Sequence, residues 1–336
     1  MTQDRGPSVS VVMPAYNETV PMISEAIDSI LGQTYTDFEF VIVLDNAENP
    51  EMESVVRGYA DADSRIKVLK NEKNLGISES LNRGIAASSG DYIARMDADD
   101  VAFPDRIEKQ LKYVMETGAS LVASDVVTID GQGAPIDMGK VLRRGSYELG
   151  DVLRHTNAVT HPTVMMSRDA LNGLGGYRRM IASEDYDLWL RFLSGGHPMR
   201  VVSEPLLYYR HREGSLTKNH MCSYIGGKYC RRLFRERLER GGQDSFSETD
   251  SEAFYRKMRY FDLRYRERFN RGYEILDESM ILFKHGKIAA GTAGLLGAVA
   301  KSGAMGRVFL ERLAMAIAKR QIFKKSRLRD GLFGEG

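Results

Sequence analysis

The sequence is poor in cysteine, with Cys222 and Cys230 as its two examples in 336 residues. This pair has neither the density of a disulfide framework nor the spacing of a zinc site, so small disulfide-rich secreted folds are excluded. No apolar run approaches the ~20 residues that a membrane-spanning helix needs. Residues 1–8 are polar and lack the apolar centre of a signal peptide. These absences indicate a cytoplasmic protein without a spanning helix.

Glycine-rich phosphate-binding loops are also missing. The first predicted strand is not followed by G-x-G-x-x-G, and G-x-x-x-x-G-K-[ST] occurs nowhere in the chain. Both motifs place backbone N–H groups against phosphates, the first in dinucleotide-binding domains and the second in P-loop enzymes. Dinucleotide and P-loop chemistry are therefore disfavoured.

Charge is distributed unevenly, although the formal net charge is only +1. Residues 1–217 contain 22 Lys and Arg against 32 Asp and Glu, a net charge of −10, and residues 218–336 contain 25 against 14, a net charge of +11. A chain divided in this way is expected to have two parts with different roles. We therefore predict an acidic domain over 1–217 and a basic region over 218–336.

Apolar periodicity predicts alternating strands and helices in the acidic part. The nearly continuous apolar run Phe38–Leu44 is typical of a strand buried on both faces. Strands are predicted at 9–13 (ended by Pro14), 38–44, 66–69 and 92–96, and helices at 23–31, 50–60, 77–87 and after Pro104, the last with Ile107, Leu111, Val114 and Met115 on its buried face. This alternation predicts a Rossmann-like layered α/β domain with a largely parallel sheet.

Polar side chains follow three of these strands at their carboxyl ends. Tyr16 and Asn17 follow the first strand, Asp45 follows the second, and Asp97-Ala98-Asp99-Asp100 follows the fourth. Parallel sheets bind ligands beyond the carboxyl ends of their strands. Carboxylates crowded at one strand end repel one another unless a cation lies among them, and such oxygen ligands suit Mg²⁺ or Mn²⁺. The alternative interpretation is a solvated acidic turn without a metal.

Short motifs are spread through residues 8–217 in a regular order. They are Pro14-Ala15-Tyr16-Asn17, Gln33-Thr34-Tyr35, Asp45, Asn74-Leu75-Gly76, Asn82, Asp97-Ala98-Asp99-Asp100, His161-Pro162-Thr163, Gly175-Gly176-Tyr177, Glu184-Asp185-Tyr186-Asp187 and Tyr209-Arg210. Together they resemble the inverting glycosyltransferases of family 2, of the bacterial polysaccharide or O-antigen type. The resemblance implies the GT-A fold, a Rossmann-like mixed and mostly parallel sheet flanked by helices, here followed by a helical C-terminal extension.

The resemblance further implies a binding site for a nucleotide-sugar donor. Tyr16 would stack on the base, and Asp45 would accept a hydrogen bond from an N–H of the base. The implied donor-binding set is Pro14, Tyr16, Asn17, Asp45, Asn74, Gly76 and Asp97. UDP- and dTDP-sugars are favoured, with a guanine nucleotide as the alternative. Outside the motif context, Asp45 would be interpreted as a helix N-cap.

The resemblance also implies a Mn²⁺ or Mg²⁺ ion at the donor diphosphate, where it would neutralise the leaving group. Asp99 would be the main ligand, and Asp97 would lie near the ribose or hold a metal-bound water. Asp100 is interpreted as the N-cap of the following helix or as a support for the ligands. His211 is assigned as a further ligand. The alternative is that Arg212, which ungapped alignment places where relatives have histidine, supplies positive charge to the phosphates directly.

Glu184 and Asp185 begin a predicted helix. Acids in a first turn commonly balance the helix dipole, which is the structural alternative. The resemblance implies that Asp185 is the general base that deprotonates the acceptor hydroxyl, with Glu184 in support. One base and direct attack imply inversion at the anomeric carbon. Covalent retaining chemistry would need a second carboxylate as nucleophile, for which the sequence offers no dedicated candidate.

The basic region is predicted to be helical. Phe309, Leu310, Leu313 and Ile317 share one face of its last helix, and six Lys or Arg residues lie between Lys319 and Arg329. A basic amphipathic helix of this kind can lie on an anionic membrane surface. A helical cap on the first domain and a homodimer contact are the alternatives. The acidic first domain argues against nucleic acid as a partner.

The sequence therefore predicts a metal-dependent enzyme that moves a hexose from a nucleotide sugar to a hydroxyl group of a glycan or lipid-linked glycan. It would be cytoplasmic or peripheral on the cytosolic face of the cell membrane. A polyprenyl-phosphate sugar synthase is one alternative, although its anionic acceptor needs no base. A sugar-1-phosphate nucleotidyltransferase is another, although Pro14-Ala15-Tyr16-Asn17-Glu18 is not the glycine-rich loop that such an enzyme needs.

Overall fold

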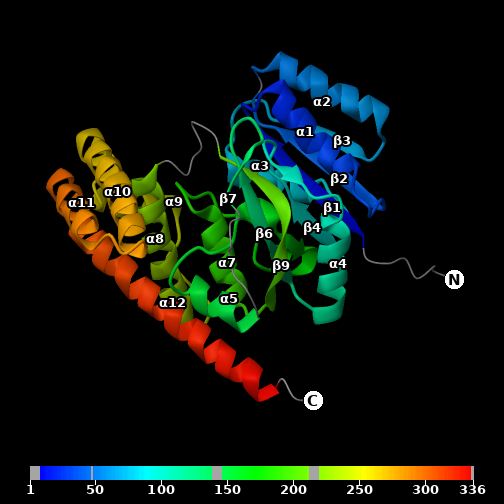
Figure 1. Ribbon diagram of the computed structural model, residues 1–336. Coiled ribbons are helices and arrows are strands. Elements are labelled where there is room, and N and C mark those ends of the chain that lie inside the picture. Colours follow the sequence, from blue (N-terminus) through cyan, green and yellow to red (C-terminus); the bar gives the residue numbers. More distant parts are fainter. Residues whose placement is uncertain (1–7, 47, 138–145, 212–218, 334–336) are drawn as a thin grey trace. The chain divides into compact units, whose positions relative to one another are not determined.

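The computed structural model describes residues 8–46, 48–137, 146–211 and 219–333 (Figure 1). The chain forms two compact units. The first comprises residues 1–153, 158–179 and 184–213, and the second comprises residues 154–157, 180–183 and 214–336. Two short segments of the second unit are therefore inserted into the sequence of the first.

The first unit is built on a mixed, mostly parallel sheet flanked by helices, as the sequence predicts (Figure 1). Its strands are β1 (Val9–Ala15), β2 (Phe38–Leu44), β3 (Ile66–Lys70), β4 (Tyr92–Arg95), β5 (Val101–Ala102), β6 (Leu121–Ile129), β7 (Pro135–Asp137), β8 (Met165–Ser167) and β9 (Met199–Arg210). Its helices are α1 (Val20–Leu31), α2 (Pro50–Ala62), α3 (Ile77–Ala86), α4 (Arg106–Thr117), α5 (Ser146–Leu153), α6 (Arg168–Gly173) and α7 (Glu184–Ser194), with a 3₁₀ turn at His161–Thr163.

The strand order is β3-β2-β1-β4-β8-β6-β9-β5, with β7 paired to β6. The first four strands along the chain are parallel to one another, whereas β8 is antiparallel to β4 and β5 is antiparallel to β9. The chain adds β2 and β3 on one side of β1 and then places β4 on the other side. Ligand crevices form where the winding reverses in this way, beyond the carboxyl ends of the strands.

The strands that lead to these ends are tightly packed in the protein core. Every residue of β1 is buried, and β2 is buried except for the partly exposed Glu39. Helix α3 approaches the sheet closely at Gly84, where an added Cβ would lie 2.5 Å from the Val12 side chain. A larger residue at this position would push the helix off the sheet, because protein interiors have no spare volume.

One predicted strand boundary is wrong. Pro14 was expected to end the first strand, but β1 continues through it to Ala15. The carbonyl of Val12 accepts a hydrogen bond from the N–H of Met96, which follows β4. Backbone groups two residues apart in a strand point to the same side, so the backbone nitrogen of Pro14 also points toward the β4 side of the strand. The pairing of β1 with β4 ends at Val12 and Arg95. The missing N–H of proline therefore removes no bond from the sheet.

One predicted helix face is also partly wrong. Ile107, Leu111 and Val114 of α4 are buried as expected, but Met115 is 59% exposed. Met115 follows Val114 by one position, which turns its side chain by about 100° around the helix axis and away from the sheet.

The second unit is helical, as predicted. Its helices are α8 (His220–Glu239), α9 (Glu248–Lys257), α10 (Leu263–Lys284), α11 (Ile288–Lys301) and α12 (Met305–Phe333). A core that includes Ile225, Tyr255, Phe269, Leu276 and Met305 holds them together. Within the described part of the chain, no helix combines the length and the apolar character that crossing a membrane requires.

Candidate active site

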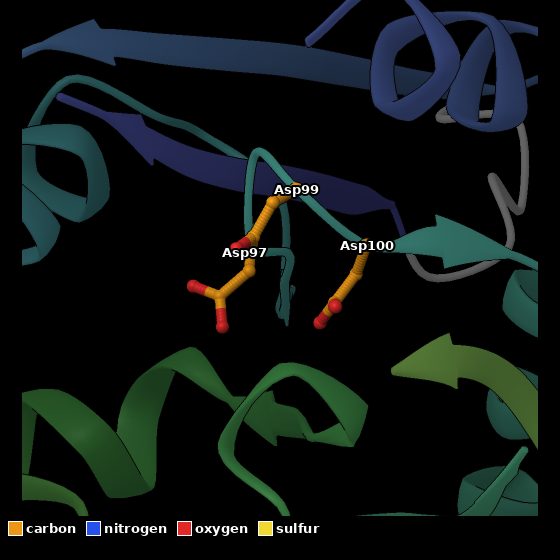
Figure 2. A group of neighbouring side chains, drawn as sticks. All are labelled: Asp97, Asp99 and Asp100. Carbon is orange, nitrogen blue, oxygen red and sulfur yellow. The ribbon is translucent and has the colours of Figure 1, made fainter. Parts of the chain in front are cut away.

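Three carboxylates gather on the turn after β4 (Figure 2). One oxygen of each of Asp97, Asp99 and Asp100 lies within 4.8 Å of the others. Asp100 is fully buried, while Asp97 and Asp99 are partly exposed. The structure thus brings together the two acids predicted as metal ligands and adds the third.

Asp100 is not the helix cap that was one of its predicted roles. The N-cap of α4 is Asp105, and Oδ1 of Asp100 instead accepts a 2.8 Å hydrogen bond from the backbone N–H of Arg210. Its other oxygen, Oδ2, is buried and has no hydrogen-bond partner among the residues that the structure describes. Burial and the charges of Asp97 and Asp99 hold the pKa of Asp100 well above its usual range. A group with this environment is either protonated or neutralised by a cation.

A buried arginine lies beside the acids. Arg95, the last residue of β4, is 3% exposed and forms an ion pair with Asp97. Its Nε and Nη1 have no hydrogen-bond partner in the described chain. Its charge lowers the pKa of Glu184 and of Tyr177 and opposes other effects that raise both. The charge of Arg95 therefore acts on Asp97 of the acid turn and on Glu184 of α7.

Two further side chains fix the backbone on either side of the turn. Arg106 is 1% exposed and donates from Nη2 to the carbonyl of Arg95 at 2.7 Å. Gln33 donates to the carbonyl of Phe103 at 2.7 Å and accepts from the N–H of Ile107 at 3.0 Å. The Gln33-Thr34-Tyr35 motif thus holds the segment that follows the acid turn.

Arg210 fastens the turn from the other side. Its Nε donates to the carbonyl of Asp99 at 2.7 Å, and its Nη2 pairs with Glu25 of α1 at 2.6 Å. Its Nη1 also reaches the carbonyl of Gly131 at 3.3 Å. The side chain of Arg210 is buried, so its bonds to the two carbonyls are shielded from solvent, whereas the side chain of its partner Glu25 is 57% exposed. The position of the acids is set by protein contacts.

Asp45 is 4% exposed, and its carboxylate is occupied by a neighbouring loop. Oδ1 accepts from Asn71 at 2.6 Å and from the N–H of Leu75 at 2.8 Å, and Oδ2 accepts from the N–H of Gly76 at 2.9 Å. The alternative role as a helix N-cap is wrong, because Asn49 caps α2. Asp45 therefore shapes the loop before α3, and its contact with a base stays a prediction.

The other predicted donor-binding residues lie around this loop and the end of β1. Tyr16 is 42% exposed, which leaves its ring open to stack on a planar group. Asn17 accepts from Asn46 at 2.7 Å. Asn74 accepts from the N–H of Gly76, whose φ of +83° favours glycine. Pro14 is buried in β1, two residues before Tyr16, and its contact with the donor stays a prediction.

The two acids predicted to supply the general base lie at the start of α7. Glu184 and Asp185 occupy its first turn, directly after Ser183, which has the unusual φ of 66° for a residue other than glycine. Burial, with the charge of Asp185 as the second cause, raises the pKa of Glu184 to about 7. The charge of Asp97 contributes to this rise, and the charge of Arg95 opposes it. The two acid groups are therefore close enough to act on one another.

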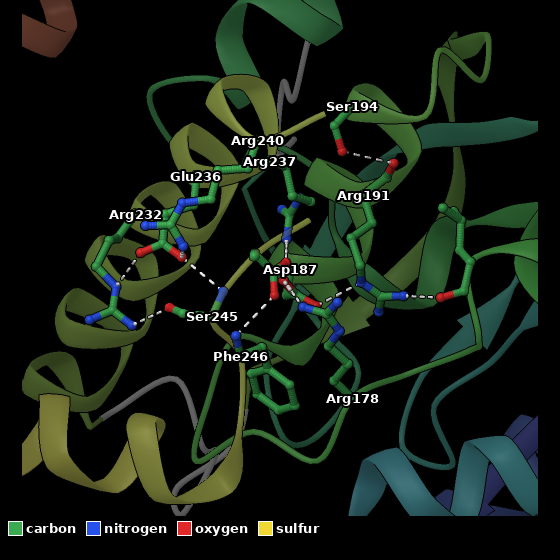
Figure 3. Close-up of polar contacts among 12 residues, drawn as sticks. Arg178, Asp187, Arg191, Ser194, Arg232, Glu236, Arg237, Arg240, Ser245 and Phe246 are labelled. Atoms are coloured by element: carbon green, nitrogen blue, oxygen red, sulfur yellow. Dashed lines mark hydrogen bonds and ion pairs between the residues drawn. The ribbon is translucent and has the colours of Figure 1, made fainter. Parts of the chain in front are cut away.

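A different acid of the same motif is structural (Figure 3). Asp187 is fully buried and accepts from Nε of Arg191 at 2.8 Å. The same guanidinium donates to the carbonyls of Leu174 at 2.7 Å and Gly176 at 2.8 Å. Asp187 and Arg191 thus tie α7 to the glycine turn ahead of Tyr177.

Asn82 holds that turn from α3. Its Nδ2 donates to the carbonyl of Tyr177 and its Oδ1 accepts the N–H of Tyr177, both at 2.8 Å. The hydroxyl of Tyr177 lies 2.9 Å from Nε2 of His161. Burial raises the pKa of Tyr177, and burial and Arg95 lower that of His161, so both are neutral near pH 7.

His211 is not brought into the acid group. It is exposed at the end of β9, its N–H donates to the carbonyl of Ile129, and it does not belong to the set of possible ligands found within the described residues. Its role as a ligand stays a prediction. Arg212, the alternative, lies outside the described residues.

Comparison with known proteins identifies the class and then the family. A model described as "Glycosyl transferase family 2" matches residues 10–175. The uncharacterized glycosyltransferase MJ1057 of Methanocaldococcus jannaschii is 38% identical over 208 residues, 61% of this chain and 71% of that protein. The O-antigen biosynthesis glycosyltransferase WbnJ of Escherichia coli is 34% identical over 229 residues, 67% of this chain and 88% of that protein. The protein is a glycosyltransferase. It belongs to glycosyltransferase family 2.

Solved structures agree on the fold. The crystal structure of S. aureus TarS 1–349 in complex with UDP-GlcNAc aligns with a TM-score of 0.55 at 16% identity, over 96% of this chain and 92% of that one. A second S. aureus TarS structure aligns equally well, but this chain covers 42% of it. The predicted GT-A arrangement is thereby confirmed.

Proposed function

We propose that the protein is a metal-dependent, inverting glycosyltransferase that moves a hexose from a nucleotide-diphosphate sugar to a hydroxyl group of a glycan acceptor. The observation that carries the proposal is the group of three carboxylates, in which the buried Oδ2 of Asp100 has no hydrogen-bond partner among the described residues. The group lies where the winding of the sheet reverses. Glu184 and Asp185, near enough for Asp97 to affect the pKa of Glu184, supply a separate pair of acids.

The residues present fit a hard divalent cation. Asp97, Asp99 and Asp100 offer carboxylate oxygens alone, the donor set that Mg²⁺ and Mn²⁺ prefer. A cation among them would explain why a buried carboxyl keeps an oxygen without a partner. When bound, the ion supplies positive charge to a diphosphate leaving group.

The protein's own acids supply the proton transfer. Asp185 accepts the proton of the acceptor hydroxyl. The hydroxyl oxygen forms a bond to the anomeric carbon, and the bond from that carbon to the diphosphate oxygen breaks. Glu184 shares the charge of the pair, and its raised pKa matches a base that works near neutral pH. Attack opposite the leaving group inverts the anomeric configuration.

The donor is proposed to be a UDP- or dTDP-sugar. The exposed ring of Tyr16 offers a stacking surface for the base, and the loop of Asn74 and Gly76 is held in place by Asp45. The structural neighbour TarS, whose structure contains UDP-GlcNAc, supports a uridine nucleotide.

The proposed setting is the synthesis of cell-surface polysaccharide, in line with WbnJ and with the amylovoran biosynthesis glycosyltransferase AmsE, which is 29% identical over 230 residues. The acceptor would be a glycan or a lipid-linked glycan. The protein would then act as a peripheral protein on the cytosolic face of the membrane that carries this acceptor.

A thermal-shift screen of nucleotide sugars, with and without Mn²⁺, tests the donor and the metal together. A ligand raises stability in proportion to the logarithm of its concentration over its dissociation constant. We expect a UDP- or dTDP-sugar to raise the melting temperature in the presence of Mn²⁺ and much less in its absence. The absence of any nucleotide-sugar effect, or an equal effect without metal, would contradict the proposal.

A further inference from the structure

The second unit exposes large apolar side chains along three consecutive helices. They are Ile281 of α10, Ile288 and Leu296 of α11, and Leu310, Leu313 and Ile317 of α12. Their exposed fractions run from 43% for Leu313 to 66% for Leu296. In the described residues of the first unit, the large exposed apolar side chains are Tyr16, Met115 and Ile136, which lie far apart in the sequence.

These side chains are not needed to hold the helices together. The inner sides of α10, α11 and α12 already meet through Gly272, Gly291, Ala298, Met305 and Val308, all buried. A Cβ added at Gly291 would lie 2.8 Å from the ring of Phe283, and one added at Gly272 would lie 2.9 Å from Met305. The helices are therefore packed as closely as their backbones allow, and the apolar residues on their outer sides are left to solvent.

From Ser279 to Leu310 the charge is of one sign, and the next residue, Glu311 of α12, forms an ion pair with Lys228 at 2.6 Å. No Asp or Glu occurs from Ser279 to Leu310, a stretch that contains Lys284, Lys287, Lys301 and Arg307. These four side chains are exposed, and none forms an ion pair with another described residue. Across α11 itself, the exposed positions before Lys301 are uncharged.

We propose that α11, the loop before it and the first half of α12 form a docking surface for an anionic lipid bilayer. Exposed Leu and Ile side chains enter the boundary between headgroups and acyl chains, and flanking Lys and Arg contact anionic headgroups. The biological role of this surface rests on the proposed function, because a bilayer would carry a lipid-linked acceptor. The exposed apolar and basic side chains that would bind the bilayer do not depend on that function.

The same charge pattern disfavours a second copy as the occupant. A two-fold dimer presses one surface against itself, which would bring Lys284, Lys287, Lys301 and Arg307 of both copies together without acidic partners. The surface extends the one expected from sequence. That expectation rested on the apolar face of the last helix, whose Leu310, Leu313 and Ile317 belong to both surfaces, and on basic residues from Lys319 to Arg329. Apart from the exposed Arg320, the side chains of these basic residues lie outside the described part of the structure.

Vesicle flotation with the full chain tests the proposal without any activity measurement. We expect the protein to float with phosphatidylglycerol vesicles, to stay behind with phosphatidylcholine vesicles, and to be released from the former by salt. The double variant Leu296→Glu, Leu310→Glu should reduce the floated fraction about tenfold, because acids on this face remove apolar contact and repel anionic lipid. The control Met115→Glu, Ile136→Glu places the same charges on the first unit and should float like the wild type.

Equal flotation of both double variants would overturn the proposal. So would a lipid-free dimer, seen by sedimentation velocity, that Leu296→Glu, Leu310→Glu converts to monomer while flotation is unchanged; that result would make the surface a contact between copies. Donor binding by the floated and non-floated variants separates this test from the proposed function. A variant that binds nucleotide sugar but not vesicles supports both proposals.

Discussion

The backbone N–H of Arg210 donates a 2.8 Å hydrogen bond to Oδ1 of Asp100, across 110 positions of the sequence. This bond joins the end of β9 to the acid turn that follows β4. The side chain of Arg210 adds a contact to the carbonyl of Asp99. The backbone bond uses Oδ1 of Asp100, and Oδ2, which has no hydrogen-bond partner among the described residues, is left open to a cation.

Asp100→Asn is expected to weaken Mn²⁺ binding about tenfold to a hundredfold, the usual range when a group that positions or completes a metal site is changed. The amide keeps an acceptor for Arg210 and loses the negative charge. Electron paramagnetic resonance of free Mn²⁺ measures the affinity directly. Asp105→Asn, on the neighbouring N-cap that makes no side-chain capping bond, is the matched control and should bind Mn²⁺ normally. Unchanged affinity in Asp100→Asn would remove Asp100 from the metal site.

Arg95→Met should lower kcat about a hundredfold, while Arg95→Lys should recover part of the loss. Methionine preserves the volume but leaves Asp97 without its ion pair and the two acid groups without their shared cation. Lysine restores the charge without the planar geometry of the guanidinium. Urea unfolding should show a loss of about 1–3 kcal/mol for the methionine variant, below the usual cost of breaking a buried pair because Asp97 is partly exposed. Equal kcat for the lysine and methionine variants would show that the charge has no catalytic effect.

Transfer should lose rate on the acid side of the pH profile, with an apparent pKa near 7. The pKa of Glu184 is raised to about 7, so below this pH the Glu184–Asp185 pair holds an extra proton and cannot accept the one from the hydroxyl. The apparent value belongs to the pair. In Glu184→Gln the acid limb should move to lower pH, because Asp185 then no longer has the negative charge of Glu184 beside it. An unmoved limb would assign the titration to another group.

Asn82→Ala is expected to destabilise the first unit by about 1–3 kcal/mol, because the backbone N–H and the backbone carbonyl of Tyr177 both lose their hydrogen-bond partner in a partly buried turn. Asn82→Asp keeps the acceptor for the N–H of Tyr177 and loses the donor to its carbonyl. It should fall between wild type and Asn82→Ala in chemical unfolding. If all three proteins unfold alike, the two 2.8 Å bonds contribute nothing to stability.

The sequence was sufficient to predict the local elements near the site. The strands that precede Tyr16, Asp45 and Asp97 are short apolar runs bounded by polar turns, and their positions agree with β1, β2 and β4. The acid turn could be located because a parallel sheet places successive carboxyl ends at one edge. Local pattern and simple topology were enough for this.

The roles within the site could not be predicted in the same way. Asp100 was interpreted as a helix cap ahead of Pro104 or as a support for the ligands, and its partner Arg210 follows it by 110 positions in the sequence. Arg95 was not singled out, since in sequence it is one charged residue in a strand; its burial and its ion pair with Asp97 exist only in the fold. Such contacts depend on the order of the strands, which periodicity does not specify.

Asp185→Asn, assayed for sugar transfer and for donor binding, tests the central claim most directly. The amide keeps the shape of the side chain and cannot take a proton from the acceptor, so transfer should fall about 10²- to 10⁴-fold while nucleotide-sugar affinity is retained. Asp169→Asn, which changes a first-turn acid of α6, should transfer at the wild-type rate. Normal transfer by Asp185→Asn would contradict its assignment as the base, and with it the proposed inverting mechanism.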